Sequence, residues 1–212
     1  MEPVFLLVLS LLLATAGAET KEAVLDTDGN ALQQGRQYHV LPSIWARGGG
    51  LRMSRLNGSC PPNVVQRFSE VKNGEPLMFF PEVPSDEGGV VRVSELVYIL
   101  FPRPNPCPQS TMWRRDNGGY ITTGGTASTI MGPHDSRFAI VKSSSAIISY
   151  NIRFCPCRVC RLPCRTVGVN DVNGKRLLTV VGSEANAHEV VFARVRDEDS
   201  TNILPATMLG ED

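Results

Sequence analysis

The sequence is poor in the residues that carry enzyme chemistry and lacks their familiar arrangements. Only three histidines occur in 212 residues, and His39, His134 and His188 stand in separate contexts. No Gly-x-Ser-x-Gly sequence is present, which excludes the nucleophile elbow of the α/β-hydrolases. His188 and Glu189 are followed by Val, Val and Phe, so the zinc-protease motif HExxH is absent as well. We therefore expect the protein not to be an enzyme.

An excess of charge of one sign is also missing, and long apolar runs are scarce. Lys and Arg number 21, as do Asp and Glu, so the charge favours neither nucleic acid nor an acidic membrane surface as a partner. The apolar run Val4–Leu13 precedes the small residues Ala16-Gly17-Ala18. A spanning helix needs about 20 apolar residues, so this pattern predicts a secretory signal peptide over residues 1–18 and no membrane anchor.

The mature chain, residues 19–212, is long enough for one domain with a substantial core. The signal peptide predicts a secreted, extracellular protein, with a vacuole as the alternative destination. The polar tail 197–212 is interpreted either as a disordered extension or as a vacuolar signal.

Helical periodicity is absent, because no apolar repeat of helical spacing lasts more than a turn or two. Short alternating or β-branched runs recur instead between Gly- and Asn-rich turns, which predicts an all-β fold of about twelve strands. Three units of four strands, beginning near residues 24, 78 and 138, favour a β-trefoil, and an eight-stranded closed barrel is the alternative. Trp113 is expected in the core. The expected strands include Tyr38–Leu41, Val64–Val65, Leu77–Phe80, Val90–Ser94, Val97–Phe101, Thr111–Arg114, Tyr120–Thr123, Phe138–Val141, Ile147–Phe154, Leu177–Val181 and Glu189–Val195.

The chain has six cysteines, all in the mature part, and an even number in a secreted protein implies disulfides. Four of them fall within the ten residues CPCRVCRLPC, which favours pairing inside this cluster and leaves Cys60 with Cys107. Zinc binding by the cluster is the competing interpretation, because Cys157-x-x-Cys160 has ligand spacing. An oxidising compartment argues against thiolate ligands. The cluster consists of Cys155, Cys157, Cys160 and Cys164.

The segment Asp26–Asn30 begins like a calcium-binding loop. Ala31 and Gln37 occupy the sixth and twelfth positions, where such a loop requires Gly and Glu. We interpret the segment as a turn between two short strands and expect no metal and no organic cofactor.

One covalent modification is predicted. Asn57-Gly58-Ser59 is an N-glycosylation sequon in a Gly-containing turn of a secreted chain, which makes Asn57 the expected glycan acceptor.

Residues 24–40, VLDTDGNALQQGRQYHV, resemble the N-terminal signature of the plant Kunitz (soybean trypsin inhibitor) family. GGGLRMS, CPPNVVQRFSEVKNGEPLMFFPEVP, EGGVVRVS, STMWR, YITTGG, RFCPCRVCRLPCRTVGV and KRLL are similar to further blocks of the family, especially of its miraculin-like branch. The resemblance implies a β-trefoil that acts as a monomer. It also implies the disulfides Cys60–Cys107, Cys155–Cys164 and Cys157–Cys160.

Members of this family inhibit proteases, most often serine proteases, by presenting one exposed loop in substrate-like form. A loop already held in its bound shape loses little entropy on docking. Counted from the Cys60-Pro61 block, the reactive bond falls at Pro84–Ser85, within the loop Phe79–Gly89. The position of the family's loop-supporting Asn is taken here by Gln34, which is longer and less rigid. The resemblance assigns the reactive loop to Glu82, Val83, Pro84, Ser85 and Asp86.

This loop departs from the pattern of a trypsin inhibitor, because it has no Arg or Lys and carries several acidic residues. Pro84 fits a specificity pocket poorly, and a shift of one residue would place Val83 or Ser85 there, of which Val83 suits an elastase-like pocket. Arg92-Val93 looks like a basic reactive bond, but its alternation places it in a strand.

We therefore expect a secreted Kunitz-type inhibitor, directed at serine proteases first and cysteine proteases second, with weak or non-trypsin specificity. The alternative is a non-inhibitory binding or storage protein on the same fold.

Overall fold

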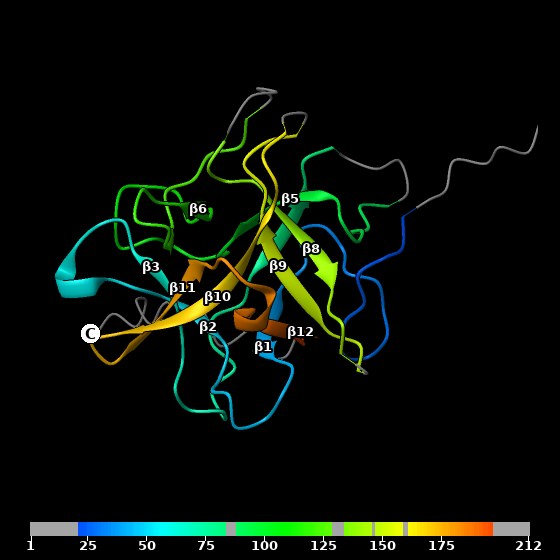
Figure 1. Ribbon diagram of the computed structural model, residues 1–212, viewed down its shortest axis with the longest axis horizontal. Helices are drawn as coiled ribbons and strands as arrows, with labels where there is room; N and C mark the ends of the chain where they lie inside the picture. Colours follow the sequence, from blue (N-terminus) through cyan, green and yellow to red (C-terminus); the bar gives the residue numbers. More distant parts are fainter. Residues whose placement is uncertain (1–20, 84–87, 129–133, 146, 159–160, 197–212) are drawn as a thin grey trace, which may run out of the picture.

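The computed structural model describes most of the chain (Figure 1). The predicted signal peptide, residues 1–18, and the tail 197–212 lie outside the described residues. Within the described part the chain forms twelve strands and the 3-10 helices η1 (Leu56–Gly58) and η2 (Glu184–Asn186). The described residues are 21–83, 88–128, 134–145, 147–158 and 161–196. The strands are β1 (Tyr38–Pro42), β2 (Leu51–Ser54), β3 (Asn63–Gln66), β4 (Met78–Pro81), β5 (Leu96–Leu100), β6 (Arg114–Arg115), β7 (Ile121–Thr122), β8 (Phe138–Lys142), β9 (Tyr150–Phe154), β10 (Arg165–Val172), β11 (Lys175–Val180) and β12 (Glu189–Arg194).

Six of these strands close into a barrel. In the order β4, β5, β8, β9, β12 and β1, each strand pairs antiparallel with the next. A bridge between Tyr38, at the start of β1, and Leu77, just before β4, completes the ring. Closure leaves this sheet without free edges, which removes the usual sites of strand-to-strand aggregation.

The other six strands form three hairpins, β2–β3, β6–β7 and β10–β11. The hairpins meet through β3, which pairs with both β11 and β7. The chain therefore consists of three units, β1–β4, β5–β8 and β9–β12. In each unit the first and last strands belong to the barrel and the two middle strands form a hairpin. This threefold plan is the predicted β-trefoil, and the eight-stranded closed barrel is wrong.

The details differ from the sequence-based prediction in four places. Of the strand predicted over Thr111–Arg114, only Arg114 lies in a strand, β6. The units begin at β1, β5 and β9, one strand away from the expected borders near residues 78 and 138. Strands β2 and β10 were not expected. The strand predicted over Val90–Ser94 is wrong, because Val90 and Arg92 make only isolated bridges and a turn with Ser94 at φ 61° follows.

Aromatic side chains fill the core in two groups. Trp113 is fully buried, as predicted, and contacts Phe138 edge-on with ring centroids 5.8 Å apart. Around Phe192, the rings of Phe79 and Tyr150 lie 5.3 and 5.6 Å away. Such pairs add roughly 0.5–1.5 kcal/mol each beyond the area they bury.

The N-terminal segment 24–33 is tied to this core by tyrosine hydroxyls. The Tyr150 hydroxyl accepts a hydrogen bond from the Leu25 N–H at 2.9 Å. Asp26 is buried, and its Oδ1 accepts the N–H groups of Asp28 and Asn30 at 3.0 and 2.8 Å. The carboxylate thus closes a turn, which agrees with the sequence-based interpretation.

Two disulfides are drawn between described cysteines, Cys60–Cys107 and Cys155–Cys164. They are two of the pairs that the family resemblance implies. Cys157 is also disulfide-bonded, and its expected partner Cys160 lies outside the described residues. The zinc alternative for the cluster is wrong, because it requires thiolates.

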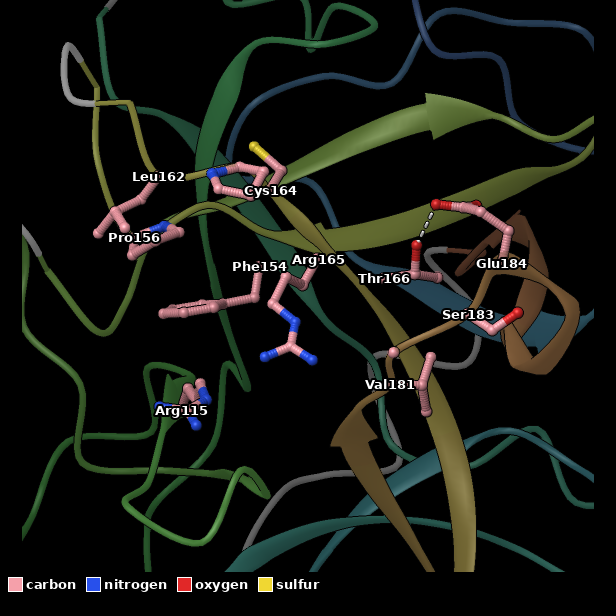
Figure 2. Close-up of a pocket in the computed structure, with 12 residues that line it drawn as sticks. Arg115, Phe154, Pro156, Leu162, Cys164, Arg165, Thr166, Val181, Ser183 and Glu184 are labelled. Carbon is pink, nitrogen blue, oxygen red and sulfur yellow. Dashed lines mark hydrogen bonds between the residues drawn. The ribbon is translucent and has the colours of Figure 1, made fainter.

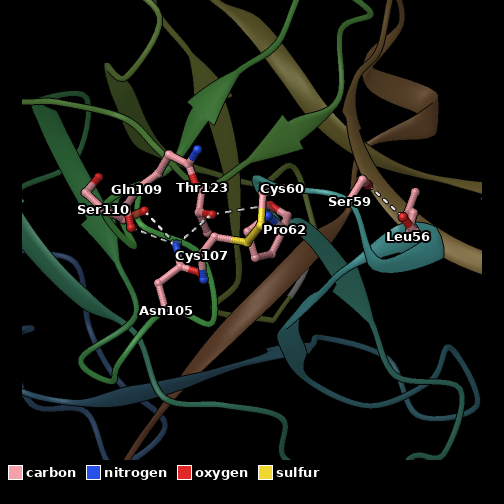
Figure 3. Close-up of a disulfide and its surroundings, with 9 residues drawn as sticks. All are labelled: Leu56, Ser59, Cys60, Pro62, Asn105, Cys107, Gln109, Ser110 and Thr123. Carbon is pink, nitrogen blue, oxygen red and sulfur yellow. Dashed lines mark hydrogen bonds between the residues drawn. A yellow bond between two sulfur atoms is a disulfide. The ribbon is translucent and has the colours of Figure 1, made fainter.

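The Cys60–Cys107 bridge connects the segment before β3 to the β5–β6 connection (Figure 3). Asn105 orders that connection: its Oδ1 accepts the Cys107 N–H at 3.1 Å, and its Nδ2 donates to the Gln109 carbonyl at 2.9 Å. The disulfide therefore links two ordered segments that lie far apart in the chain.

Candidate functional site

The segment singled out as the reactive loop leaves the barrel at the end of β4. Pro84, Ser85 and Asp86, and with them the expected reactive bond, lie outside the described residues. Val83, the last described residue before them, has half of its side chain exposed (50%). What the structure establishes is how the two ends of this loop are held.

The first end is fixed by a buried ion pair. The Glu82 N–H donates to the Leu96 carbonyl at 2.8 Å. Its Oε1 accepts a hydrogen bond from Arg137 Nε at 2.6 Å, and the two side chains are 7% and 1% exposed. Glu82 is therefore not an acidic group on the loop surface, as its place in the loop had suggested. It turns inward and anchors the loop to Arg137, just before β8.

Tyr98 and Ser128 complete this anchor. The Tyr98 hydroxyl donates to the Ser128 carbonyl at 2.9 Å, accepts the Ser128 N–H at 3.1 Å, and lies 3.3 Å from Glu82 Oε1. Arg137 Nη2 also reaches the Ser128 carbonyl at 3.4 Å. Sequence reasoning missed this cluster, because Glu82 and Arg137 are 55 residues apart and belong to no common motif.

The second end of the loop is held by backbone contacts. The Gln34 N–H donates to the Gly89 carbonyl at 2.7 Å, and the Val91 N–H donates to the Leu32 carbonyl at 2.9 Å. Gly89 has φ +73°, and a Cβ there would lie 3.1 Å from the Gln34 Cβ. The predicted support residue thus contacts the loop through its main chain, while Gln34 itself is exposed.

The alternative reactive bond Arg92–Val93 lies elsewhere. Arg92 forms a bridge with Ala23, and its Nη1 donates to the Lys21 carbonyl at 2.7 Å. Val93 packs against the core. The bond therefore lies in a segment that pairs with the N-terminal residues and packs on the core, outside the proposed reactive loop.

A cavity of about 680 Å³ lies beside the cysteine cluster (Figure 2). The Arg165 side chain points into it between Phe154 and Val181, and the Arg115 guanidinium carbon lies 5.8 Å from the centroid of the Phe154 ring. Glu184 Oε1 accepts the Thr166 hydroxyl at 2.6 Å.

Asn57, the predicted glycan acceptor, is exposed and lies in η1 with φ 51°. The Ser59 hydroxyl of the sequon donates to the Leu56 carbonyl at 2.6 Å. Glycosylation stays a prediction, at a site open to solvent.

In the described part of the chain, no group of three or more His, Cys, Asp or Glu residues is placed to hold a metal ion. None of the helices found there is long and apolar enough to cross a membrane.

His188, just before β12, and Glu189, its first residue, have pKa values that are both lowered, but by different causes. Burial lowers the pKa of His188 to about 4, and the positive charges of Arg176 and Arg47 act in the same direction. For Glu189, burial acts to raise the pKa, but hydrogen bonds from Ser145 and from two further serine hydroxyls lower it overall.

We expect the His188 pKa to make the protein less stable in mild acid. The unfolded chain takes up this proton near pH 6.5 and the folded chain only near pH 4. The unfolding free energy should therefore have its highest value above pH 6.5. It should decrease by up to about 3 kcal/mol as the pH drops to 4. Urea unfolding between pH 4 and 7 measures this loss. His188→Gln should remove most of it and His134→Gln should not; a His188 pKa near 6.5 by NMR would contradict the expectation.

Comparison with known proteins identifies relatives along nearly the whole described chain. The family model described as trypsin and protease inhibitor, Kunitz (legume) type, matches residues 24–194. A trypsin/chymotrypsin inhibitor of Alocasia macrorrhizos is 42% identical, with 82% of this chain and 98% of that protein covered. Miraculin of Synsepalum dulcificum is 37% identical, with 79% and 82% covered. The crystal structure of alocasin, a protease inhibitor from giant taro (Arum macrorrhizon), superposes with a TM-score of 0.73 at 40% identity over 82% of this chain and 99% of that one.

Proposed function

Because this chain belongs to the Kunitz family of trypsin and protease inhibitors, we propose that it inhibits endopeptidases by presenting the segment between Glu82 and Gly89 as a substrate-like loop. Members of the family are inhibitors and not enzymes, which agrees with the absence of catalytic motifs from the sequence. The observation that carries the proposal is the double anchoring of the loop, by the buried Glu82–Arg137 pair at one end and by the Gln34–Gly89 hydrogen bond at the other. Ends held in this way reduce the entropy lost on docking and keep a cleaved bond in register for rejoining.

The loop chemistry points to a serine protease other than trypsin. The loop has no Arg or Lys, and the inward turn of Glu82 removes its charge from the contact surface. Val83 is a half-exposed, small apolar side chain, the kind that elastase-like pockets accept. A cysteine protease is the second class of target.

We propose further that the protein acts outside the cytosol as a monomer. The apolar run before residue 18 has the form of a signal peptide, and disulfides such as Cys60–Cys107 persist in oxidising compartments. The exposed sequon at Asn57 also agrees with passage through the secretory pathway, where N-glycans are added. An extracellular location is expected, with a vacuole as the alternative.

A protease panel with a pair of loop variants tests the proposal. Purified protein should inhibit elastase or subtilisin at submicromolar concentration and trypsin more weakly, with chymotrypsin and papain completing the panel. Pro84→Arg and Val83→Arg each place a cation at one candidate position before the reactive bond. The variant in the correct register should inhibit trypsin about 100-fold more tightly than the unaltered protein, as expected for one charged hydrogen bond in an acidic pocket.

The matched control is Val71→Arg, which adds the same charge at a residue 80% exposed on the β3–β4 connection. It should leave trypsin inhibition unchanged. If none of the proteases is inhibited and neither loop variant gains activity, the inhibitory function is refuted.

The alternative function is a non-inhibitory binding or storage protein. The observation in its favour is the loop without a basic residue, together with the similarity to miraculin. Binding on a glycan array by a protein that inhibits no protease would support this alternative.

A further inference from the structure

A second cavity, of about 640 Å³, lies between the β10–β11 hairpin, η2 and the β1–β2 connection. Asn170 comes from β10, Arg176 from β11, Asn186 from η2 and Arg47 from the β1–β2 connection, while His188 lies just before β12. The His188 N–H donates to the Val167 carbonyl at 3.0 Å, which fixes the histidine against β10. The proposed inhibitory loop contributes no residue to this cavity.

Both arginines bring positive charge to the cavity, although the charge of Arg47 also acts on Glu189 and helps to lower the pKa of that carboxylate. Neither Arg47 nor Arg176 forms an ion pair with a carboxylate among the described residues. The hydrogen bonds of the nearby carboxylates go to other groups: Glu189 Oε1 accepts the hydroxyls of Ser143 and Ser149, and Asp171 Oδ1 accepts the Gly174 N–H. Two cations in one concave site raise the local concentration of anions.

The position of Arg176 is set before any ligand arrives. Its guanidinium carbon lies 5.9 Å from the centroid of the Phe68 ring, a cation–π distance. It also lies against Gly48, where a Cβ would come within 2.4 Å of Arg176 Nη1. Gly48, with φ +95°, therefore leaves the room that the guanidinium occupies. A charged group held in place needs little ordering when it binds.

His188 supplies an unused polar atom at the same place. Its Nε2 is out of contact with solvent and has no hydrogen-bond partner among the described residues. A buried polar atom without a partner costs about 1–3 kcal/mol. Burial, and after it the positive field of Arg176 and Arg47, lowers the pKa of His188 and keeps the ring uncharged.

We propose that this cavity binds the tetrahedral oxyanion of a phosphate or sulfate monoester, with Arg176 and Arg47 as charged donors and the uncharged His188 ring in its lining. Planar guanidinium groups match such oxyanions in charge and geometry. The volume exceeds that of the oxyanion alone and leaves room for an esterified group of sugar size. The exposed amides of Asn170 and Asn186 line that space.

NMR of the histidine ring signals of the intact protein tests the inference. Inorganic phosphate, inorganic sulfate and glucose 6-phosphate serve as probes, with chloride at matched ionic strength as reference. Each probe should shift the His188 signals to saturation, and phosphate should raise the pKa of His188. Binding of phosphate should strengthen from pH 6 to 8, as its dianion forms, whereas sulfate binding should not, and this contrast separates the two ligand chemistries.

Variants identify the residues responsible. Arg176→Gln and Arg47→Gln should each weaken binding about tenfold, the effect of one charge-assisted hydrogen bond, and Arg176→Lys should restore part of it. Arg165→Gln removes the same charge from the cavity of Figure 2 and should leave binding unchanged. Because Arg47 is exposed, its variant remains informative if Arg176→Gln fails to fold.

Two results would overturn the inference. One is a response to phosphate and sulfate no larger than the response to chloride. The other is an equal loss of binding in Arg165→Gln and Arg47→Gln, which would mean a general response to net charge. Neither result affects the protease panel, so the inhibitory function and the oxyanion site are tested separately.

Discussion

Replacing Arg137 by Ala is expected to lower the unfolding free energy by about 3–5 kcal/mol, since it leaves the Glu82 carboxylate buried without its cation. The Arg137 guanidinium is 1% exposed and lies 2.6 Å from Glu82 Oε1. Loss of the pair also frees the first end of the proposed inhibitory loop. We therefore expect protease inhibition to weaken in parallel, which chemical denaturation and inhibition constants on the same samples would measure.

An exposed ion pair of the same chemistry provides the matched control. Arg103 Nη1 lies 3.2 Å from Glu75 Oε1, with side chains 42% and 18% exposed. Arg103→Ala should cost less than about 1 kcal/mol, because solvent screens such pairs. The double variant Glu82→Gln/Arg137→Met removes both charges and should recover part of the stability while inhibition stays weak. A similar small loss for Arg137→Ala and Arg103→Ala would show that the buried pair is not an anchor.

The second large effect concerns the disulfides. Cys60→Ser is expected to lower the unfolding free energy more than Cys157→Ser, because the longer loop restricts the unfolded chain more. Cys60 and Cys107 are 47 residues apart, and a disulfide that closes a loop of this length stabilises the folded state by about 4 kcal/mol. The loop closed by the expected Cys157–Cys160 disulfide contains only four residues, so this disulfide should stabilise the folded state by only about 2 kcal/mol.

Paired variants avoid a leftover thiol in this comparison. Cys60→Ser/Cys107→Ser and Cys157→Ser/Cys160→Ser should unfold in denaturant with the same order of losses. Cys155→Ser/Cys164→Ser, whose cysteines are 9 residues apart, should fall between them at about 3 kcal/mol. Equal losses in the three double variants would show that loop length does not govern their stability.

Much of the architecture was predictable because local patterns express it. Alternating β-branched runs between Gly and Asn turns located most of the barrel strands, and Trp113, predicted in the core, is fully buried. The errors have local causes. Strand β10 contains Gly168 and the polar pair Asn170-Asp171, so its apolar pattern is weak. In Val90–Ser94 the alternation is present, but Ser94 turns the chain with φ 61°.

By itself the sequence determined the class of protein: an all-β chain with paired cysteines, the blocks of the Kunitz family and a loop without a basic residue. These properties reside in residue types and short spacings. Only the tertiary structure decided that Glu82 turns inward to Arg137, that Gln34 holds Gly89 through its main chain, and that His188 shares a cavity with Arg47 and Arg176. The physical reason is chain distance: side chains far apart in sequence acquire partners, burial and shifted pKa values only when barrel closure brings their strands together.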